Sequence, residues 1–273
     1  FFFRSSTTST TKSKDAAMKF PALSMLLSLG SLLRPSESAN VLIVGDSMGE
    51  FSTNVLETFC SGSTVKNAAL GGTTAAQWAT YNEDVVAGCG GSYDYVWISL
   101  GGNDLLGSPG CGMSASELQS LVSSAITNIK TNIAPGATKY LTTCYCQPQG
   151  PEEGSACNTP QLVSKLCDGI KAASDADPDV EYVPSLDACG GSSTQFSNPG
   201  YFEDQIHLNK RGYCKFFTRP AIQSLLQCGS QQTFDCEAMD CEMTGYDLQC
   251  NGDAGKDEFG GECSPFQGGG GGG

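Results

Sequence analysis

The sequence has only one histidine, His207, among its 273 residues, and it has 15 basic residues against 29 acidic ones. The single histidine, together with the lack of two Cys-x-x-Cys clusters at zinc spacing, argues against a structural metal site. The formal net charge of −14 at pH 7 repels nucleic-acid backbones and anionic membrane surfaces. These shortages predict a protein without a bound metal and without a nucleic-acid partner.

The sequence also lacks an N-terminal apolar run of comfortable membrane-spanning length, because the run Phe20–Leu33 is too short. This run follows Met18 and a lysine, and cleavage after Ser38 would place small residues where a signal peptidase needs them. The pattern predicts a leader and signal peptide over residues 1–38, with Met18–Ser38 as the signal, and a secreted, extracellular protein with no stable membrane span. An uncleaved anchor is the alternative.

Cysteine, in contrast, is abundant, with 14 residues. This number is typical of disulfides formed in an oxidising compartment, and the close pair Cys144 and Cys146 is expected to belong to the disulfide set. The composition divides the remaining chain into a domain over residues 39–228 and an acidic, Cys-rich tail over residues 229–273 that ends in a glycine run. The tail is predicted to be a small disulfide-stapled appendage, and pairing of its four cysteines among themselves would allow three connectivities. Its carboxylates either bind calcium or a partner, or simply form a solvated surface.

The central stretch of the domain is Val41-Leu42-Ile43-Val44, followed by Gly45-Asp46-Ser47. Four aliphatic residues predict a buried parallel strand, and ligand sites in open α/β sheets lie at the carboxyl ends of strands. Ser47 is therefore a candidate nucleophile. The structural alternative is that Asp46 or Ser47 only caps the next helix.

The rest of the domain alternates between strand-like and helical segments. Strands are predicted at 41–44, 64–70, 94–100, 138–143 and 180–183, and helices at 50–59, 75–86, 115–133, 161–173 and 209–227, with a possible break at Pro220. Five strands alternating with helices predict a three-layer α/β fold with a parallel sheet.

Polar or glycine-rich turns follow the first three predicted strands, and the segment Asp204–His207 precedes the last helix. A serine nucleophile needs a base, and His207 is the only histidine that could serve Ser47. The base in turn needs an orienting partner, which Asp204 can provide from the same loop.

An oxyanion formed at Ser47 also needs preorganised donors. The backbone N–H groups of Ser47 and Gly72 and the side-chain amide of Asn103 are suitable. The structural alternative is that Asn103 and Asp104 are plain turn residues. Gly71 is expected to be structural.

Four blocks of the sequence together resemble the SGNH (GDSL) hydrolases, in the right order: Gly45-Asp46-Ser47, Asn67 through Gly72, Gly101-Gly102-Asn103-Asp104 and Asp204-x-x-His207. The resemblance covers roughly residues 41–227 and is closest to the thioesterase/lysophospholipase type of the family. It implies a flavodoxin-like fold and ester hydrolysis through an acyl-enzyme, with no metal or other cofactor. It assigns Ser47 as nucleophile, His207 as base, Asp204 as its partner, and Ser47, Gly72 and Asn103 as the oxyanion hole.

Several alternatives stay open at this point. The expected substrate is a small-molecule or glycan ester, either a lipid acyl ester or an O-acetylated carbohydrate. Gly45-x-Ser47-x-Gly49 also matches the nucleophile elbow of α/β-hydrolases, although Asp204 lies unusually close to His207 for that fold. A catalytically silent extracellular binding or matrix protein on the same fold is the alternative from a different class.

Overall fold

The structure is a computed structural model, and it describes residues 39–60, 63–89, 91–108, 111–146, 157, 159–185, 191–192, 194–195, 198–204, 206–226 and 236. The predicted leader and signal peptide over residues 1–38 lie outside the described residues, as does the tail over 229–273 except for Cys236.

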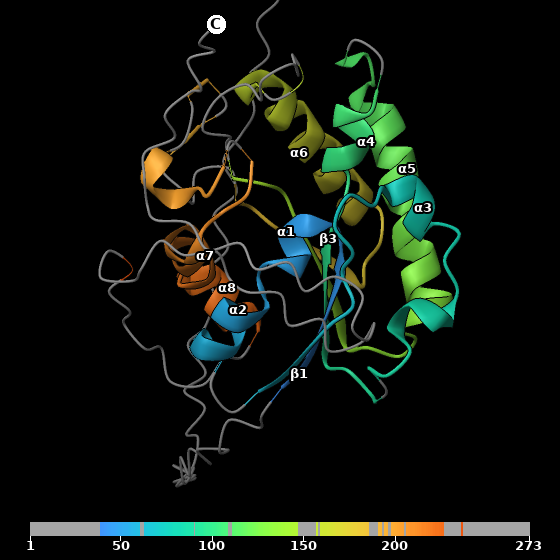
Figure 1. The fold of residues 1–273 in the computed structure, drawn as a ribbon. Helices are drawn as coiled ribbons and strands as arrows, with labels where there is room; N and C mark the ends of the chain where they lie inside the picture. Colours follow the sequence, from blue (N-terminus) through green and yellow to red (C-terminus); the bar gives the residue numbers. More distant parts are fainter. Residues whose placement is uncertain are drawn as a thin grey trace, which may run out of the picture. The chain divides into compact units, whose positions relative to one another are not determined.

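A five-stranded sheet forms the centre of the described fold (Figure 1). Its strands are β1 (Asn40–Gly45), β2 (Thr64–Asn67), β3 (Tyr95–Ser99), β4 (Lys139–Thr143) and β5 (Val180–Val183). All neighbouring strands are parallel, and their order is β2-β1-β3-β4-β5. This is the flavodoxin-like order of doubly wound folds, so the predicted fold class is confirmed.

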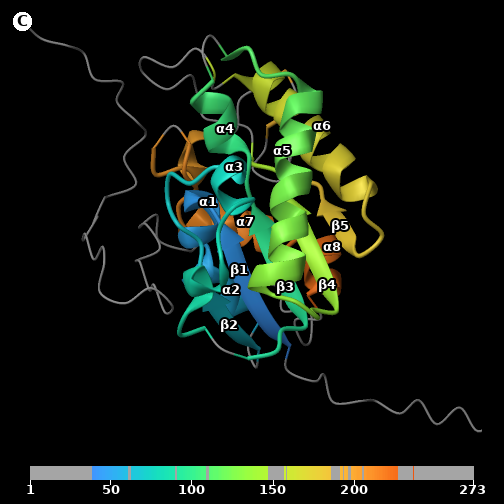
Figure 2. The ribbon, with the colours of Figure 1, turned by 90° about the vertical axis from the view of Figure 1, so that its right-hand side faces the viewer.

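Helices cover both faces of the sheet. They are α1 (Ser47–Glu50), α2 (Thr53–Phe59), α3 (Ala75–Trp78), α4 (Gly102–Leu106), α5 (Ala115–Asn128), α6 (Pro160–Asp175), α7 (Lys210–Phe217) and α8 (Pro220–Leu225), with single turns η1 (Glu83–Val86) and η4 (Pro199–Tyr201) and the π-helical turn η3 (Ile129–Ile133). Helices α3, α4, α5 and α6 lie on one side of the sheet, and α2, α7 and α8 lie on the other (Figures 1 and 2).

The alternation of side chains along β1 explains this three-layer arrangement. Val41 and Ile43 belong to the core that contains the buried residues of α2 and α7, whereas Leu42 and Val44 belong to the core with those of α5 and α6. Successive side chains of a strand point to opposite faces, so an unbroken apolar run supplies both cores. Trp97 of β3 is 2% exposed, as expected for a core residue.

Three predicted helices are shorter in the structure. The helix expected over 50–59 begins at Thr53 as α2, and residues Ser47–Glu50 form the separate short helix α1. The helix expected over 75–86 ends at Trp78, and the carbonyls of Trp78 and Tyr81 accept hydrogen bonds from the Asn128 side chain at 2.8 and 2.7 Å. This contact from α5 satisfies carbonyls that a longer helix would have used. The helix expected over 209–227 divides into α7 and α8 just before Pro220, because proline cannot continue the backbone hydrogen bonds.

Disulfides connect separate parts of the fold. Cys144 at the end of β4 is bonded to Cys167 of α6, and Cys111 is bonded to Cys157. Cys214 of α7 is bonded to Cys236, the first cysteine of the tail. A disulfide therefore staples the tail, as predicted, and it joins the tail to the domain. The alternative in which all four tail cysteines pair among themselves is wrong, because Cys236 is bonded to Cys214.

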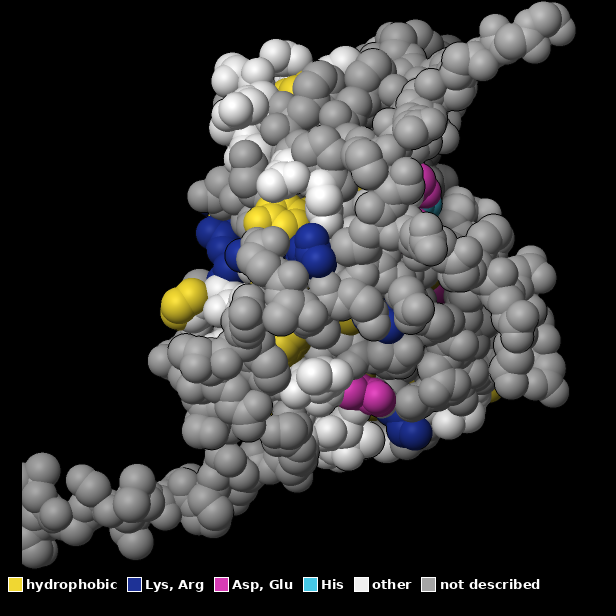
Figure 3. All heavy atoms as spheres, turned by 60° about the vertical axis from the view of Figure 1, so that its left-hand side comes forward, with side chains coloured by type: hydrophobic (Ala, Val, Ile, Leu, Met, Phe, Trp, Pro, Cys, Tyr) yellow, Lys and Arg dark blue, Asp and Glu magenta, His cyan; other side chains and the backbone are white. Residues whose placement is uncertain are grey.

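On the face drawn in Figure 3, some of the described Lys and Arg side chains lie beside hydrophobic ones, and another lies next to an acidic one. Within the described ranges, no helix is both long enough and apolar enough to cross a bilayer.

Candidate active site

Ser47 lies at the carboxyl edge of the sheet, where β1 passes directly into α1. Gly45 has a φ of +128°, and a Cβ atom at this position would lie 2.0 Å from the carbonyl oxygen of Ser99. Only glycine fits this backbone, which turns sharply against β3. Asp46 then caps α1 by accepting a hydrogen bond from the amide of Met48 at 3.1 Å. Asp46 therefore caps α1, as one of the sequence-based alternatives predicted. The Ser47 side chain is not the cap and can bind another partner.

That partner is His207. Its Nε2 atom lies 2.8 Å from Ser47 Oγ, and its Nδ1 atom lies 2.6 Å from Asp204 Oδ2. The other carboxylate oxygen of Asp204 accepts hydrogen bonds from the backbone amides of Ile206 and His207 at 2.7 and 2.6 Å. The ring of Phe51 contacts the imidazole edge to face, with 5.0 Å between the centroids. The structure therefore joins the three predicted residues in one chain of hydrogen bonds.

These contacts stabilise the ionised form of Asp204. Partial burial opposes its ionisation, but the hydrogen bonds and the charge of His207 outweigh burial, and the pKa of Asp204 is lowered. An ionised Asp204 accepts the Nδ1–H of the imidazole and leaves Nε2 available as an acceptor for the Ser47 hydroxyl. This is the arrangement that a general base requires.

The predicted oxyanion donors lie around the same point. Ser47 is the first residue of α1, so its N–H cannot be used inside the helix. A Cβ atom on Gly71 would lie 3.8 Å from the Ser47 Cβ, which places the turn containing Gly72 beside the serine. Asn103 Nδ2 donates one hydrogen bond to the carbonyl of Thr73 at 2.9 Å, and its second N–H hydrogen is available to a ligand.

The neighbours of these donors have structural contacts. Asp104 accepts hydrogen bonds from the amides of Ala75 and Ala76 at 2.7 and 3.3 Å, which ties the α4 turn to the start of α3. A Cβ atom on Gly71 would lie 2.5 Å from Glu50 Oε2, so Gly71 leaves room for that carboxylate, and a structural role is the better account of this glycine. A pocket opens beside Ser47, and of the two residues Asn103 and Asp104, Asn103 lines it and Asp104 does not.

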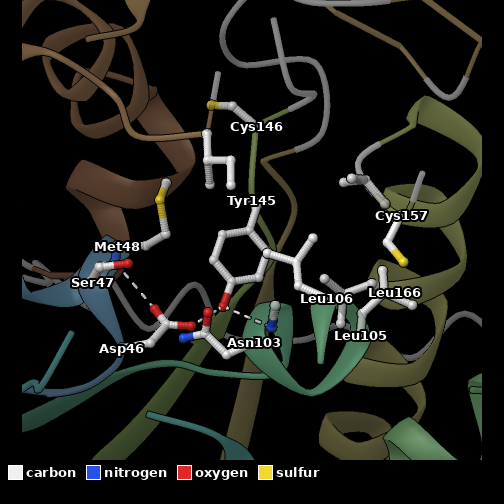
Figure 4. A pocket seen from close by; sticks show the side chains of 13 residues that line it. Asp46, Ser47, Met48, Asn103, Leu105, Leu106, Tyr145, Cys146, Cys157 and Leu166 are labelled. Atoms are coloured by element: carbon white, nitrogen blue, oxygen red, sulfur yellow. Dashed lines mark hydrogen bonds between the residues drawn. The ribbon is translucent and has the colours of Figure 1, made fainter. Parts of the chain in front are cut away.

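Tyr145, which sequence reasoning did not single out, belongs to the same network (Figure 4). Its hydroxyl donates a hydrogen bond to Asp46 Oδ2 and accepts one from the amide of Gly102 at 3.1 Å. Ser99 Oγ donates to the other oxygen of Asp46 at 3.1 Å. Tyr145 lies two residues beyond the end of β4 and thus at the carboxyl edge of the sheet. Its position just after a predicted strand is the one feature of the sequence that points to it.

Burial dominates the ionisation of Asp46, which is 2% exposed. Burial raises its pKa to about 6, although the hydrogen bonds from Tyr145, Met48 and Ser99 work in the opposite direction. The nucleophile turn therefore contains a carboxyl group that titrates far above the usual aspartate range.

No group of three or more His, Cys, Asp or Glu side chains that could hold a metal occurs within the part of the chain that the structure describes.

The fold and this site define an α/β protein of the flavodoxin-like class with a Ser-His-Asp array at the carboxyl edge of its sheet. The model of the GDSL-like lipase/acylhydrolase family matches residues 45–214, which is more than half of the sequence. The chain belongs to this family of ester hydrolases, as the resemblance of the four sequence blocks indicated.

Solved structures share the fold at low sequence identity. A protein from Streptococcus pneumonia is 18% identical with a TM-score of 0.55 and matches 69% of this chain and 84% of its own. A GDSL-like lipase from Bacteroides thetaiotaomicron is 18% identical with a TM-score of 0.52, covering 68% of this chain and 89% of its own. The α/β hydrolase LAE5 from the metagenome of Lake Arreo, Spain, is 15% identical with a TM-score of 0.52, covering 72% of this chain and all of its own. No match was found among the curated proteins.

Proposed function

We propose that this protein is a secreted serine esterase that hydrolyses carboxylic esters through an acyl-enzyme. The observation that carries the proposal is the continuous chain of hydrogen bonds from Ser47 through His207 to Asp204. Ester hydrolysis by the family supports the reaction class. Secretion is supported by the apolar segment before Ser38 and by the cysteine content, because disulfides persist in oxidising compartments.

The proposed reaction has two halves. Ser47 Oγ attacks the ester carbonyl carbon while its proton passes to His207 Nε2, and the ionised Asp204 stabilises the imidazolium. The N–H groups of Ser47 and Gly72 and the Asn103 amide hold the oxyanion. His207 then donates the proton to the leaving alcohol oxygen as the C–O bond breaks. In the second half, water gives a proton to His207 and attacks the acyl carbon. The bond from this carbon to Ser47 Oγ then breaks while His207 returns the proton to Oγ, which releases the acid and restores Ser47.

The substrate is proposed as a small-molecule or glycan ester, with a lipid acyl ester and an O-acetylated carbohydrate as the two candidates. The second candidate function is a catalytically silent extracellular binding protein, which is favoured by the acidic, Cys-rich composition of the tail. The two functions differ in one property, because only an esterase needs a reactive Ser47.

Labelling with a fluorophosphonate, followed by mass mapping of the adduct, tests this property on purified, oxidised protein. We expect an adduct on Ser47 in the wild type, none in Ser47→Ala, and a strongly slowed reaction in His207→Ala. Ser120→Ala is the matched control, because Ser120 is an exposed serine of α5 whose hydroxyl only donates to the carbonyl of Ser116. A folded protein whose Ser47 stays unlabelled would favour the binding protein.

A further inference from the structure

Glu50 is an acidic residue in the interior of the protein, close to the active site. It is the last residue of α1, the short helix that begins with Ser47, and it is 9% exposed. Burying a carboxylate costs free energy unless polar partners compensate for the lost water. The partners of Glu50 therefore indicate what this buried acid does.

The carboxylate of Glu50 lies against the turn that contains Gly72. Burial raises the pKa of Glu50, and a hydrogen bond from the backbone amide of Gly71 opposes this rise. A Cβ atom on Gly71 would lie 2.5 Å from Glu50 Oε2. A side chain at position 71 would thus occupy the place of the carboxylate, so the acid and the glycine fit together as a pair.

The end of β1 holds both flanks of the same turn. The amide of Leu70 donates to the carbonyl of Gly45 at 2.8 Å, and the hydroxyl of Thr73 lies 3.1 Å from the same carbonyl oxygen. Gly71 and Gly72 lie between these two flanks. Glu50 therefore contacts the middle of the turn, directly before the residue whose amide is a proposed oxyanion donor.

The backbone at Gly72 benefits from this support. Its φ is +75°, and an added Cβ atom would have no neighbour within 4 Å. Glycine loses more conformational freedom than any other residue when its backbone is fixed. The N–H of Gly72 belongs to the peptide group that follows Gly71, so a hydrogen bond on the amide of Gly71 restricts the direction in which the Gly72 N–H points.

Glu50 is itself held in place beside the base. The side-chain amide of Asn67, at the end of β2, donates to the backbone carbonyl of Glu50 at 2.9 Å. The next residue, Phe51, packs edge to face on the imidazole of His207. The main chain at the end of α1 is thus fixed between β2 and the base, and the side chain of Glu50 can transmit this fixed position to the turn.

We propose that Glu50 is a positioning residue of the active site, whose carboxylate holds the Gly71–Gly72 turn so that the Gly72 amide points at the oxyanion formed on Ser47. This inference rests on the proposed esterase function. It adds to that function a residue that acts through Gly71 rather than on the substrate itself.

Steady-state kinetics of two Glu50 variants test the proposal on oxidised protein, with the best substrate in a series of p-nitrophenyl esters from acetate to laurate. Glu50→Ala removes the acceptor, and we expect kcat to fall about 10- to 100-fold with little change in KM, because a displaced oxyanion donor weakens the transition state more than the ground state. Glu50→Gln should keep kcat within about fivefold of the wild type, because its amide oxygen can still accept the Gly71 N–H. Equal losses of kcat in the two variants would overturn the proposal.

Gly71→Ala breaks the same contact from the other side, and it carries the test if Glu50→Ala does not fold. The φ of Gly71 is not positive, so alanine fits the backbone, but its Cβ atom would displace the carboxylate. We expect a loss of kcat similar to that of Glu50→Ala. The double variant Glu50→Ala/Gly71→Ala should lose little more than either single variant, because one shared contact is broken in all three. Losses that multiply in the double variant would show that the two residues act independently, and they would overturn the proposal.

Asp94→Ala is the matched control. Asp94 also accepts a hydrogen bond from a backbone amide, that of Asn40 at 2.8 Å, but at the opposite end of β1 from Ser47. It should lose stability in urea unfolding without a change in kcat. A folded Glu50→Ala or Gly71→Ala variant that keeps the wild-type kcat overturns the role of Glu50 and leaves the esterase function standing. A folded wild type that hydrolyses no ester and forms no fluorophosphonate adduct overturns both.

Discussion

The hydroxyl of Tyr145 donates a hydrogen bond to the carboxylate of Asp46, and at the same time it accepts one from the amide of Gly102. Asp46 precedes Ser47, and Gly102 precedes Asn103. One phenol group therefore joins the turn that carries the proposed nucleophile to the turn that carries a proposed oxyanion donor. We interpret Tyr145 as a positioning residue, because its hydroxyl acts through Asp46 and Gly102.

Replacing Tyr145 by phenylalanine removes this hydroxyl and keeps the ring that lines the pocket. Two polar groups lose their partner, so we expect a loss of about 1–3 kcal/mol in the free energy of unfolding. We also expect kcat for p-nitrophenyl acetate to fall roughly tenfold with little change in KM, because the donors are displaced relative to Ser47 while the pocket wall stays intact. Steady-state kinetics and urea unfolding measure the two effects.

Tyr140→Phe is the matched control for this variant. Tyr140 is also buried, and its hydroxyl donates to the carbonyl of Ala134 at 2.7 Å within the α5 side of the fold. It should lose stability in the same way without a change in kcat. A kcat loss of equal size in both variants would show that Tyr145 has only a structural role.

The buried Asp46 predicts a specific pH dependence of stability. Its pKa of about 6 in the folded protein exceeds the ordinary value of 3.8, so the folded state binds the proton more tightly than the unfolded state. The contribution to stability is fully present below the unfolded pKa and is lost as the pH rises through the folded pKa. Over this window the loss is about 3 kcal/mol.

Urea unfolding of the wild type and of Asp46→Asn between pH 3.5 and pH 7 isolates this contribution. We expect the stability of the wild type relative to the variant to decrease as the pH rises from 4 to 6 and then to level off. A difference between the two proteins that stays constant over this range would contradict a raised pKa for Asp46.

Asn103 offers a test of the oxyanion hole. Asn103→Ala removes a donor that the transition state needs more than the ground state does, so we expect kcat to fall about 10²- to 10³-fold with little effect on KM. Asn128→Ala is the control, because the Asn128 amide also donates to backbone carbonyls but from the last residue of α5. If the two variants retain similar kcat values, Asn103 is only a turn residue that supports Thr73.

The sequence was sufficient to predict the parts of the site that depend on strand order. Ser47, Gly72 and Asn103 all follow strands of one parallel sheet, and the carboxyl ends of such strands share an edge. His207 could be paired with Ser47 because the chain has no other histidine. Local motifs and topology together were therefore enough to bring these residues to one place.

Contacts between distant segments were not predictable in the same way. Tyr145 is 99 residues from Asp46, and its path after β4 is fixed by tertiary packing and disulfides, which leave no periodic signal in the sequence. The early end of α3 has a similar cause, because Asn128 of α5 supplies the donors that stop the helix. The helix predicted over 50–59 begins later, at Thr53, because the separate short helix α1 over Ser47–Glu50, capped by Asp46, comes before it.

The disulfide between Cys214 and Cys236 leads to a prediction about how much the attachment of the tail stabilises the fold. The bond closes a separation of 22 residues, so removing it with the double variant Cys214→Ala/Cys236→Ala should lower the free energy of unfolding by about 3 kcal/mol. The preference among p-nitrophenyl esters should stay unchanged, because neither cysteine lines the pocket.

The double variant Cys111→Ala/Cys157→Ala provides the contrast. Cys157 lines the pocket, so removing its disulfide loosens a pocket wall, and longer esters should become better substrates relative to acetate. Thermal unfolding and the ester series, run on both double variants, distinguish the two disulfides. An unchanged melting temperature in Cys214→Ala/Cys236→Ala would mean that the tail is not held to α7 by this bond.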